Sequence, residues 1–358
     1  FHKSGGPLLC WGSAGSFKTN QILNGGIQVG KGRYLLKRLI YIVFVFFIIS
    51  ILMFFIYKIM PGDPVTMMLG DAKANMKPDA YQRLYEQTRE SLGLNSPLYV
   101  QYIRWIGNML TGNFGYSTQY KTDVINMIGT PMLNTVMLNL VSMLVTFLIA
   151  VPLGIATAVR RNTVFDKAVQ VVTIVGYSLP SFIIALLAIF AFAVKIPIFP
   201  ISGVRTAGFE GNSFQMALDT LWHMALPVIV MSISGIGSIT RYVRAAMIDV
   251  LRMDYIKTAR SKGLREKVVI YVHAFRNALI PVVTIATAWV VSLFGGSIVI
   301  ENVFLWPGLG QTLINGLMQR DFSVVLTMQM FYVVLSLAGN VIMDIAYTIV
   351  DPRVRLEN

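Results

Sequence analysis

The chain has 358 residues, of which 55% are hydrophobic and only 13% are charged, and its net charge is +13. A soluble domain of this size carries about 25% charged residues, so this composition excludes a soluble globule and predicts an integral membrane protein. The single cysteine, Cys10, excludes an internal disulfide framework, and the three histidines are too far apart in sequence to suggest a metal site.

Residues 1–32 are rich in Gly, Ser and Asn and show no helical periodicity. This composition predicts a leader or expression-derived segment that precedes the fold. Gly25 to Gly32 nearly match a phosphate-binding loop, but Gly32 stands where a hydroxyl would hold magnesium and no strand precedes the match. We therefore expect no nucleotide site in this chain.

Apolar stretches of about 20 residues are long enough to cross a hydrocarbon core about 30 Å thick. The sequence contains six of them, near residues 38–60, 133–159, 168–194, 222–243, 279–300 and 323–350. The predicted fold is an all-α integral membrane protein with six transmembrane helices.

Basic residues are unevenly distributed among the segments that connect these stretches. Alternate segments hold 18 basic and 6 acidic residues in total (31–38, 160–167, 241–276 and 351–358), whereas the others hold 10 of each (58–131, 195–221 and 301–322). Cytoplasmic loops retain Lys and Arg, so both termini are predicted to face the cytoplasm, with a large extracellular segment, 61–131, between the first and second spans. The positive charge then faces anionic membrane lipid, and nucleic acid is not needed to explain it.

The extracellular segment contains a helical pattern at residues 79–94. One face recurs at three- and four-residue steps and consists of Tyr81, Leu84, Tyr85, Thr88 and Leu92. This face is consistent with a packed extracellular cap and also with a surface that receives a substrate-delivering partner.

Proline residues Pro152, Pro180 and Pro227 are expected to interrupt apolar helices. Membrane helices tolerate such breaks beside an aqueous path, so Ser178, Pro180 and Ser181 are candidates for lining a translocation path. A packing kink, with both hydroxyls bonded to the preceding turn, explains the same residues.

Asp344 is the only charged residue well inside a predicted span, and it lies near the cytoplasmic end of that span. Ion-coupled carriers place ionisable groups near the midplane to bind the coupling ion. The energy for transport is therefore expected to come from elsewhere.

The basic segment between the fourth and fifth predicted spans contains a short cytoplasmic helix. Asp254 is a suitable N-cap and Gly263 a suitable terminator, which frames a helix from Tyr255 to Lys262. Ala259 on one face allows close backbone approach, while the basic residues (Lys257, Arg260 and Lys262) suit an acidic groove. The alternative is an ordinary loop whose charges satisfy topology and anionic lipid.

An ordered set of motifs resembles the permease subunits of binding-protein-dependent ABC importers of the dipeptide, oligopeptide and nickel group. The motifs are PGDP at 61–64, LGLNSPLYVQYIRWIGNMLTGNFGYS at 92–117, IPIFPISG at 196–203, YIKTARSKGL followed by HAFRNALIP within 255–281, VFLWPGLGQ at 303–311, RDF at 320–322 and DPRVR at 351–355. YIKTARSKGL is similar to the EAA loop of the superfamily. Ala259 and Gly263 match that loop, whereas Lys257 and Thr258 replace the usual Glu and Ala.

The resemblance implies a permease subunit of an ATP-driven importer of di- or oligopeptides in a bacterial or archaeal cell membrane. It implies a heterodimer with a second homologous permease, two cytoplasmic ABC ATPase subunits that use ATP and Mg, and an extracellular peptide-binding protein. The chain itself would be no enzyme and would bind no cofactor or metal.

By motif position, residues 33–358 would form the transmembrane domain and 245–278 its cytoplasmic coupling loop. The residues expected to couple this loop to the ATPase are Asp254, Tyr255, Thr258, Ala259, Arg260, Lys262 and Gly263.

Import of nickel or a metal chelate by the same type of complex remains an alternative, because a chelated metal needs no metal ligands in the spans. An ion-coupled secondary carrier would need a midplane ionisable site and usually internal repeats, and neither is found. A membrane-embedded enzyme would need a catalytic pattern such as HExxH or GxSxG, and the sequence contains neither.

Overall fold

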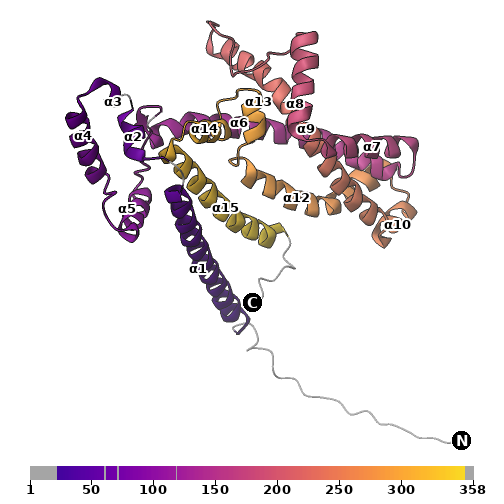
Figure 1. The fold of residues 1–358 in the computed structure, drawn as a ribbon. Helices are drawn as coiled ribbons and strands as arrows, with labels where there is room; N and C mark the ends of the chain where they lie inside the picture. The colour runs from indigo at the N-terminus through magenta and orange to yellow at the C-terminus, as the bar shows by residue number, and fades with distance from the viewer. Residues whose placement is uncertain (1–21, 60–61, 71, 118, 351–358) are drawn as a thin grey trace, which may run out of the picture.

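The protein, seen in a computed structural model, is almost entirely helical over the residues that the structure describes, 22–59, 62–70, 72–117 and 119–350 (Figure 1). Four helices in this part are long and apolar enough to cross a membrane. They are α1 (Ile22–Ile59), α6 (Val124–Val159), α9 (Ser213–Leu251) and α15 (Phe322–Val350).

A bent helix pair supplies a fifth candidate span. It consists of α7 (Val164–Ser178), α8 (Ser181–Ile189) and the π-helix η1 (Phe190–Lys195), and it is bent by 97° at the break between α7 and α8. The predicted fifth span overlaps α12 (Phe275–Ser292), but that helix is followed by Gly295 and by Gly296, whose φ is +62°. The chain is thus a multi-pass helical membrane protein with four or five candidate spans among its described residues, and the count of six is not confirmed.

Two of the three expected proline breaks are absent. Pro152 lies inside α6 and Pro227 inside α9, and both helices continue without interruption. Each proline removes only one backbone donor, and in helices this long the remaining hydrogen bonds hold the backbone together. Only Pro180 coincides with a break, where it caps α8.

The largest core lies between α6 and α9, which run along each other (Figure 1). Small residues allow this close packing: a Cβ atom on Gly154 would lie 2.6 Å from Cβ of Val243, and one on Gly237 would lie 2.7 Å from the Thr173 carbonyl oxygen in α7. Met247, near the end of α9, is completely buried in the same core.

The segment between α1 and α6 forms a small helical unit of its own. It contains α2 (Pro64–Leu69), α3 (Ala72–Asn75), α4 (Pro78–Ser91), α5 (Leu98–Leu110) and a two-stranded hairpin in which β1 (Tyr116–Ser117) pairs antiparallel with β2 (Thr122–Asp123). The predicted face of α4 is partly buried at Tyr81, Leu84, Tyr85 and Thr88, whereas Leu92 lies beyond the helix and is exposed.

The last third of the chain contributes to a second hydrophobic core. A second core joins Val124 of α6, Leu309 of α14 (Leu309–Met318) and Met328 of α15, and all three are fully buried. Between α12 and α14 lies the one-and-a-half-turn helix α13 (Ile298–Val303).

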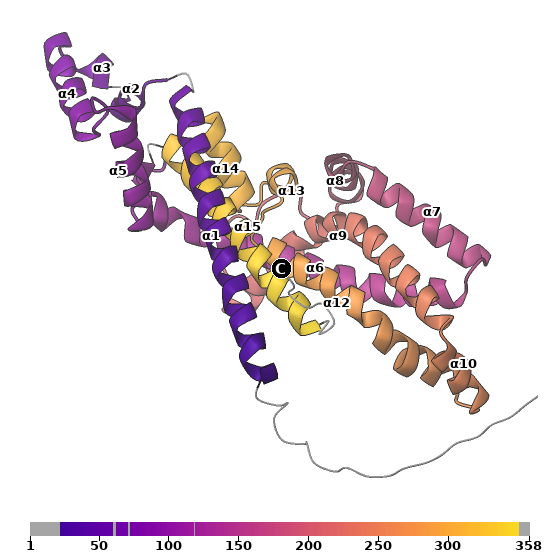
Figure 2. The ribbon, with the colours of Figure 1, turned by 90° about the horizontal axis from the view of Figure 1, so that it is seen from below.

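The basic segment contains α10 (Asp254–Ser261), α11 (Glu266–Val268) and the π-helix η2 (Val269–Ala274). Both views place α10 and α4 at opposite ends of the molecule (Figures 1 and 2). The sequence placed them on opposite sides of the membrane, and the observed separation is compatible with that.

The first helix begins earlier than the predicted span at residues 38–60. Helix α1 begins at Ile22, so residues 22–32, including the near-match to a phosphate loop, are helical. Residues 1–21, the terminal motif at 351–355 and the side chain of Asp344 lie outside what the structure describes.

Candidate coupling interface

The short helix predicted in the basic segment is present as α10, and it starts one residue earlier than predicted. Its N-cap is Met253, and Asp254 is its first residue and makes no capping hydrogen bond. Instead, the Asp254 carboxylate accepts a hydrogen bond from Nζ of Lys257 at 2.8 Å, which holds the pKa of Asp254 below its usual value. The expected capping role of Asp254 is therefore wrong, since the side chain is engaged along the helix and not at its end.

Only one face of α10 is open. Ile256 and Ala259 are buried in the core that α9 and η2 share, with exposed fractions of 0% and 7%. The expectation that small Ala259 leaves room for an approaching partner needs correction, because this side chain seats the helix against its own subunit. The exposed face presents Tyr255, Thr258 and Arg260.

Gly263 ends the helical segment as predicted. Lys262 is the exposed C-cap, and Gly263 follows with φ of +75°, a left-handed conformation that residues with a Cβ rarely adopt. Its amide donates to the Arg260 carbonyl at 2.9 Å. The turn redirects the chain toward α11.

Arg260 makes an ion pair that the sequence did not reveal. Its Nη2 and Nε lie 2.6 Å and 3.2 Å from the two carboxylate oxygens of Glu266. This pairing raises the pKa of Arg260 and lowers that of Glu266. Both side chains are about half exposed, so the pair is accessible at the surface. The partners are six positions apart with the left-handed Gly263 between them, and no helical spacing rule would have paired them.

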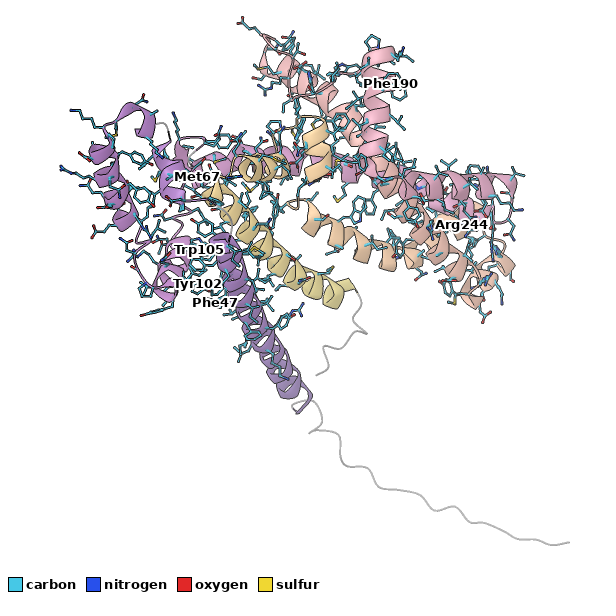
Figure 3. All side chains as sticks on the ribbon, in the orientation of Figure 1. Phe47, Met67, Tyr102, Trp105, Phe190 and Arg244 are labelled. Atoms are coloured by element: carbon cyan, nitrogen blue, oxygen red, sulfur yellow. The ribbon has the colours of Figure 1, made fainter. Side chains whose placement is uncertain are left out.

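A buried ion pair supports the helix that leads into α10. Asp166, in the first turn of α7, accepts hydrogen bonds from Nε and Nη2 of Arg244 in α9 at 2.7 Å and 2.8 Å (Figure 3 labels Arg244). The same carboxylate accepts from the Asn162 amide at 2.9 Å and from Nε2 of Gln170 at 2.8 Å. Because all four donors converge on a fully buried group, α7 and α9 are held in register.

The three candidate path residues lie at the bend between α7 and α8. Ser178 and Pro180 are exposed and Ser181 is half-buried. Neither serine hydroxyl makes a hydrogen bond within the described residues, so the expected bonding to the preceding turn is not observed. The bend also exposes Leu179 and Phe182.

A second buried carboxylate, Glu301, was missed by the sequence analysis. It is fully buried in α13 and accepts hydrogen bonds from Oγ1 of Thr135 at 2.9 Å and from the amides of Gly310 and Gln311 at 2.7 Å and 3.1 Å. It therefore caps α14 and joins that helix to α6. Burial raises its pKa.

We call Glu301 and its hydrogen-bond donors the Glu301 hub. Its signal in the sequence was a carboxylate five residues before Trp-Pro-Gly-Leu-Gly. A Cβ on Gly308 would lie 2.5 Å from the Glu301 carboxyl carbon. Nε1 of Trp306 donates to the Asn134 carbonyl at 3.1 Å, and Nδ2 of Asn134 donates to the Pro307 carbonyl at 2.9 Å. The motif is thus a structural joint between α6 and α14.

Comparison with known proteins decides the family. Residues 150–356 match the family described as the inner membrane component of binding-protein-dependent transport systems, and residues 32–139 match its N-terminal region. The chain belongs to this family. Helix α10 and both ion pairs of the basic segment lie in the first match, and the helical unit between α1 and α6 lies in the second.

Curated relatives of this binding-protein-dependent permease cover nearly its whole length. It is 40% identical over 322 residues to the oligopeptide transport system permease protein AppB of Bacillus subtilis (strain 168), a match that covers 90% of this chain and 98% of the relative. It is 34% identical over 339 residues to the di/tripeptide transport system permease protein DppB of Pseudomonas aeruginosa (strain UCBPP-PA14), covering 90% and 98%.

Among solved structures, the permease is similar to a chain of the MetNI methionine ABC transporter in an inward-facing conformation. The TM-score is 0.45 at 19% sequence identity, with 62% of this chain and 96% of the other covered. The family assignment rests on the sequence matches alone.

Proposed function

We propose that this chain is the permease subunit of an ATP-driven importer of di- and oligopeptides, and that α10 couples it to a cytoplasmic ATPase. The observation that carries the coupling role is the seating of α10. Ile256 and Ala259 fix the helix to α9 and η2, while Tyr255, Thr258 and Arg260 remain open. A helix held on one face and free on the other moves with its own subunit when a partner pushes it.

The length of α9 supports transmission of that movement. Its 39 residues extend about 58 Å at 1.5 Å per residue, from the loop after η1 to the two residues that precede α10. The pair of Arg244 with Asp166 passes a displacement of α9 to α7, and α7 leads to the bend at Pro180. Displacement of α10 would therefore reach the candidate path residues through packed helices.

The substrate class is proposed from the relatives. The two described above are named for oligopeptides and for di- and tripeptides, and this favours peptides over the nickel or metal-chelate alternative. Specificity would reside largely in the extracellular binding protein, which delivers the peptide to the end of the permease where α4 and α5 lie.

The remaining parts of the proposal concern assembly. The chain would supply half of the path and pair with a second homologous permease, and two ATPase subunits would bind ATP and Mg on the cytoplasmic side. Both termini and α10 would face the cytoplasm, and residues 61–131 the exterior. Exposed apolar side chains on the spans, such as Leu148, Leu187 and Val172, suit contact with lipid or with the second permease.

The test is peptide uptake by proteoliposomes that contain the complex copurified with this chain in mild detergent. Mass spectrometry should identify a second permease and nucleotide-binding ATPases. Uptake should require ATP on the side of the membrane where the ATPases lie, and it should persist when ion gradients are collapsed. Uptake driven by an ion gradient without ATP, from vesicles that contain this chain alone, would show that the chain is a self-sufficient carrier.

A further inference from the structure

A cavity of about 260 Å³ lies where the end of α1 meets α2, α5 and the start of α15. It lies beside the ends of two spans and next to the helical unit between α1 and α6. The volume is smaller than the roughly 300–1,000 Å³ of pockets for small molecules. It suits protruding side chains better than a free peptide.

Three basic residues line this cavity: Lys58, Arg104 and Arg320. One carboxylate, Asp321, also lines it, but that group already accepts hydrogen bonds from Oγ of Ser117 at 2.6 Å and from the Gln119 amide at 3.1 Å. Within the described residues, neither arginine guanidinium has an ion-pair or hydrogen-bond partner. The cavity therefore carries uncompensated positive charge.

The basic side chains are held in place by built features. Nζ of Lys58 donates to Oε1 of Gln101, whose own amide donates to the Leu94 and Ser96 carbonyls at 3.0 Å and 2.6 Å. Arg104 lies against Gly93, where an added Cβ would lie only 1.6 Å from Nη1 of the arginine. These contacts fix Lys58 from α5 and place the Arg104 guanidinium over a bare backbone.

The backbone of Arg320 is held in a strained conformation. Its φ is +56°, a conformation that costs a non-glycine residue about 1 kcal/mol or more. The next residue holds it there, because the Asp321 amide donates to the Gly316 carbonyl at 2.8 Å while its carboxylate is anchored to β1.

The cavity walls are aromatic. The ring of Phe54 lies 5.8 Å from that of Trp105, and the ring of Tyr57 lies 5.2 Å from that of Phe322. Figure 3 shows Trp105 and Tyr102 on α5 beside α1, and Met67 above them. A cavity that combines cations with apolar and aromatic walls is suited to bind a carboxylate carried on an aliphatic chain.

We propose that this cavity receives an acidic side chain, Asp or Glu, from the extracellular binding protein when that protein docks on the permease. The inference rests on the proposed function and gives the docking site its chemistry. Charge complementarity selects the occupant, since three cations face one committed carboxylate. Leu92, Leu94 and Arg320, which line the cavity, lie outside the candidate spans, so the cavity extends beyond them on the side that is extracellular in the proposed orientation.

The experiment uses the complete importer in nanodiscs of zwitterionic lipid and measures its affinity for its own binding protein at several salt concentrations, without nucleotide. The variant Arg104→Glu with Arg320→Glu should weaken binding at least about tenfold and flatten the salt dependence. The matched variant Arg104→Lys with Arg320→Lys keeps the charge and should bind within about threefold of the original. Arg83→Glu, an exposed charge reversal on α4 outside the cavity, should change affinity less than about twofold.

Copurification of both permeases and the ATPases establishes that a variant is assembled. If the double reversal prevents assembly, Arg320→Glu alone gives the same test, because this side chain is exposed. Unchanged affinity in an assembled variant overturns the site, and so does a loss of affinity that appears only in nanodiscs of anionic lipid, which would assign the cations to the membrane surface. If the original complex neither binds a binding protein nor imports peptide, the proposed function itself fails.

Discussion

Arg244 of α9 holds both carboxylate oxygens of Asp166 in α7, at 2.7 Å and 2.8 Å, and this pair ties the helix that precedes α10 to the helix that leads to the Pro180 bend. The partners are 78 residues apart in sequence. The Asp166 side chain is 1% exposed and that of Arg244 is 20% exposed, so the pair is only partly screened by solvent.

Replacing Asp166 with Asn should destabilise the protein by about 2–4 kcal/mol, because it leaves Arg244 without its countercharge. It should also lower transport per ATP hydrolysed. Thermal unfolding in detergent and uptake in proteoliposomes measure the two effects. The neighbouring change Lys167→Gln, at an exposed residue, should alter neither.

A double-mutant cycle with Arg244→Gln separates the pair from its surroundings. The double variant should be less destabilised than the sum of the two single changes by more than about 1 kcal/mol. Additive effects would show that the two residues act independently.

Changes at the seat of α10 should uncouple ATP hydrolysis from transport. Ala259→Arg inserts a long cation into a site that is 7% exposed, and Gly263→Val puts a β-branched residue at φ of +75°. Each should abolish peptide uptake while the protein remains in the membrane. Ser261→Ala, an exposed residue of the same helix, is the control, and normal uptake by both variants would disprove the coupling role.

Glu266→Gln should release Arg260 with little effect on stability, about 0.5 kcal/mol or less, because the pair is exposed. Its effect should appear in the affinity between the permease and the ATPases, measured by their dissociation in detergent with rising salt. Arg260→Lys, which keeps a charge but loses the two-point contact, is the companion variant. If neither change alters ATPase affinity, Arg260 lies outside the interface.

The pH dependence of this pair follows from the lowered pKa of Glu266. The stabilisation that the pair gives the folded protein is fully present above 4.5, the ordinary pKa of Glu. It disappears only as the pH falls through the lower pKa that Glu266 has in the folded protein. Between pH 6 and 8, the ATPase affinity of the original protein should therefore show no step due to Glu266. A step in that range that Glu266→Gln removes would contradict the assigned direction.

Small changes at the Glu301 hub, which lies far from α10, should have strong effects on stability. Gly310→Ala would place a Cβ 2.7 Å from the Ile298 Cα atom, and Glu301→Gln cannot accept at both oxygens. Each should lower stability by about 2–3 kcal/mol or prevent assembly. Gly107→Ala in α5, where an added Cβ has no neighbour within 4 Å, should be neutral or slightly stabilising, as seen in melting temperature.

Much of the candidate interface could be predicted from local pattern. The predicted bounds of α10 came within a residue of the observed ones, because Asp254 and Gly263 mark the two ends of this short polar segment in the sequence. The orientation of its faces could not be predicted, since Ile256 and Ala259 share a core with Val269 and Ile270, which follow the turn at Gly263 in the chain.

By itself the sequence determined that the chain is a helical membrane protein of this permease family, because long apolar runs and ordered motifs are local properties. Only the tertiary structure decided which carboxylates are buried and paired. Asp166, Glu301 and Asp321 all lie in segments that the sequence placed in polar connections, yet each is 1% exposed or less. Several of their partners, such as Arg244, Thr135 and Ser117, come from segments far away in the sequence, and sequence spacing does not reveal that these side chains meet. The 97° bend between α7 and α8 is likewise a feature of the fold that hydropathy alone does not reveal.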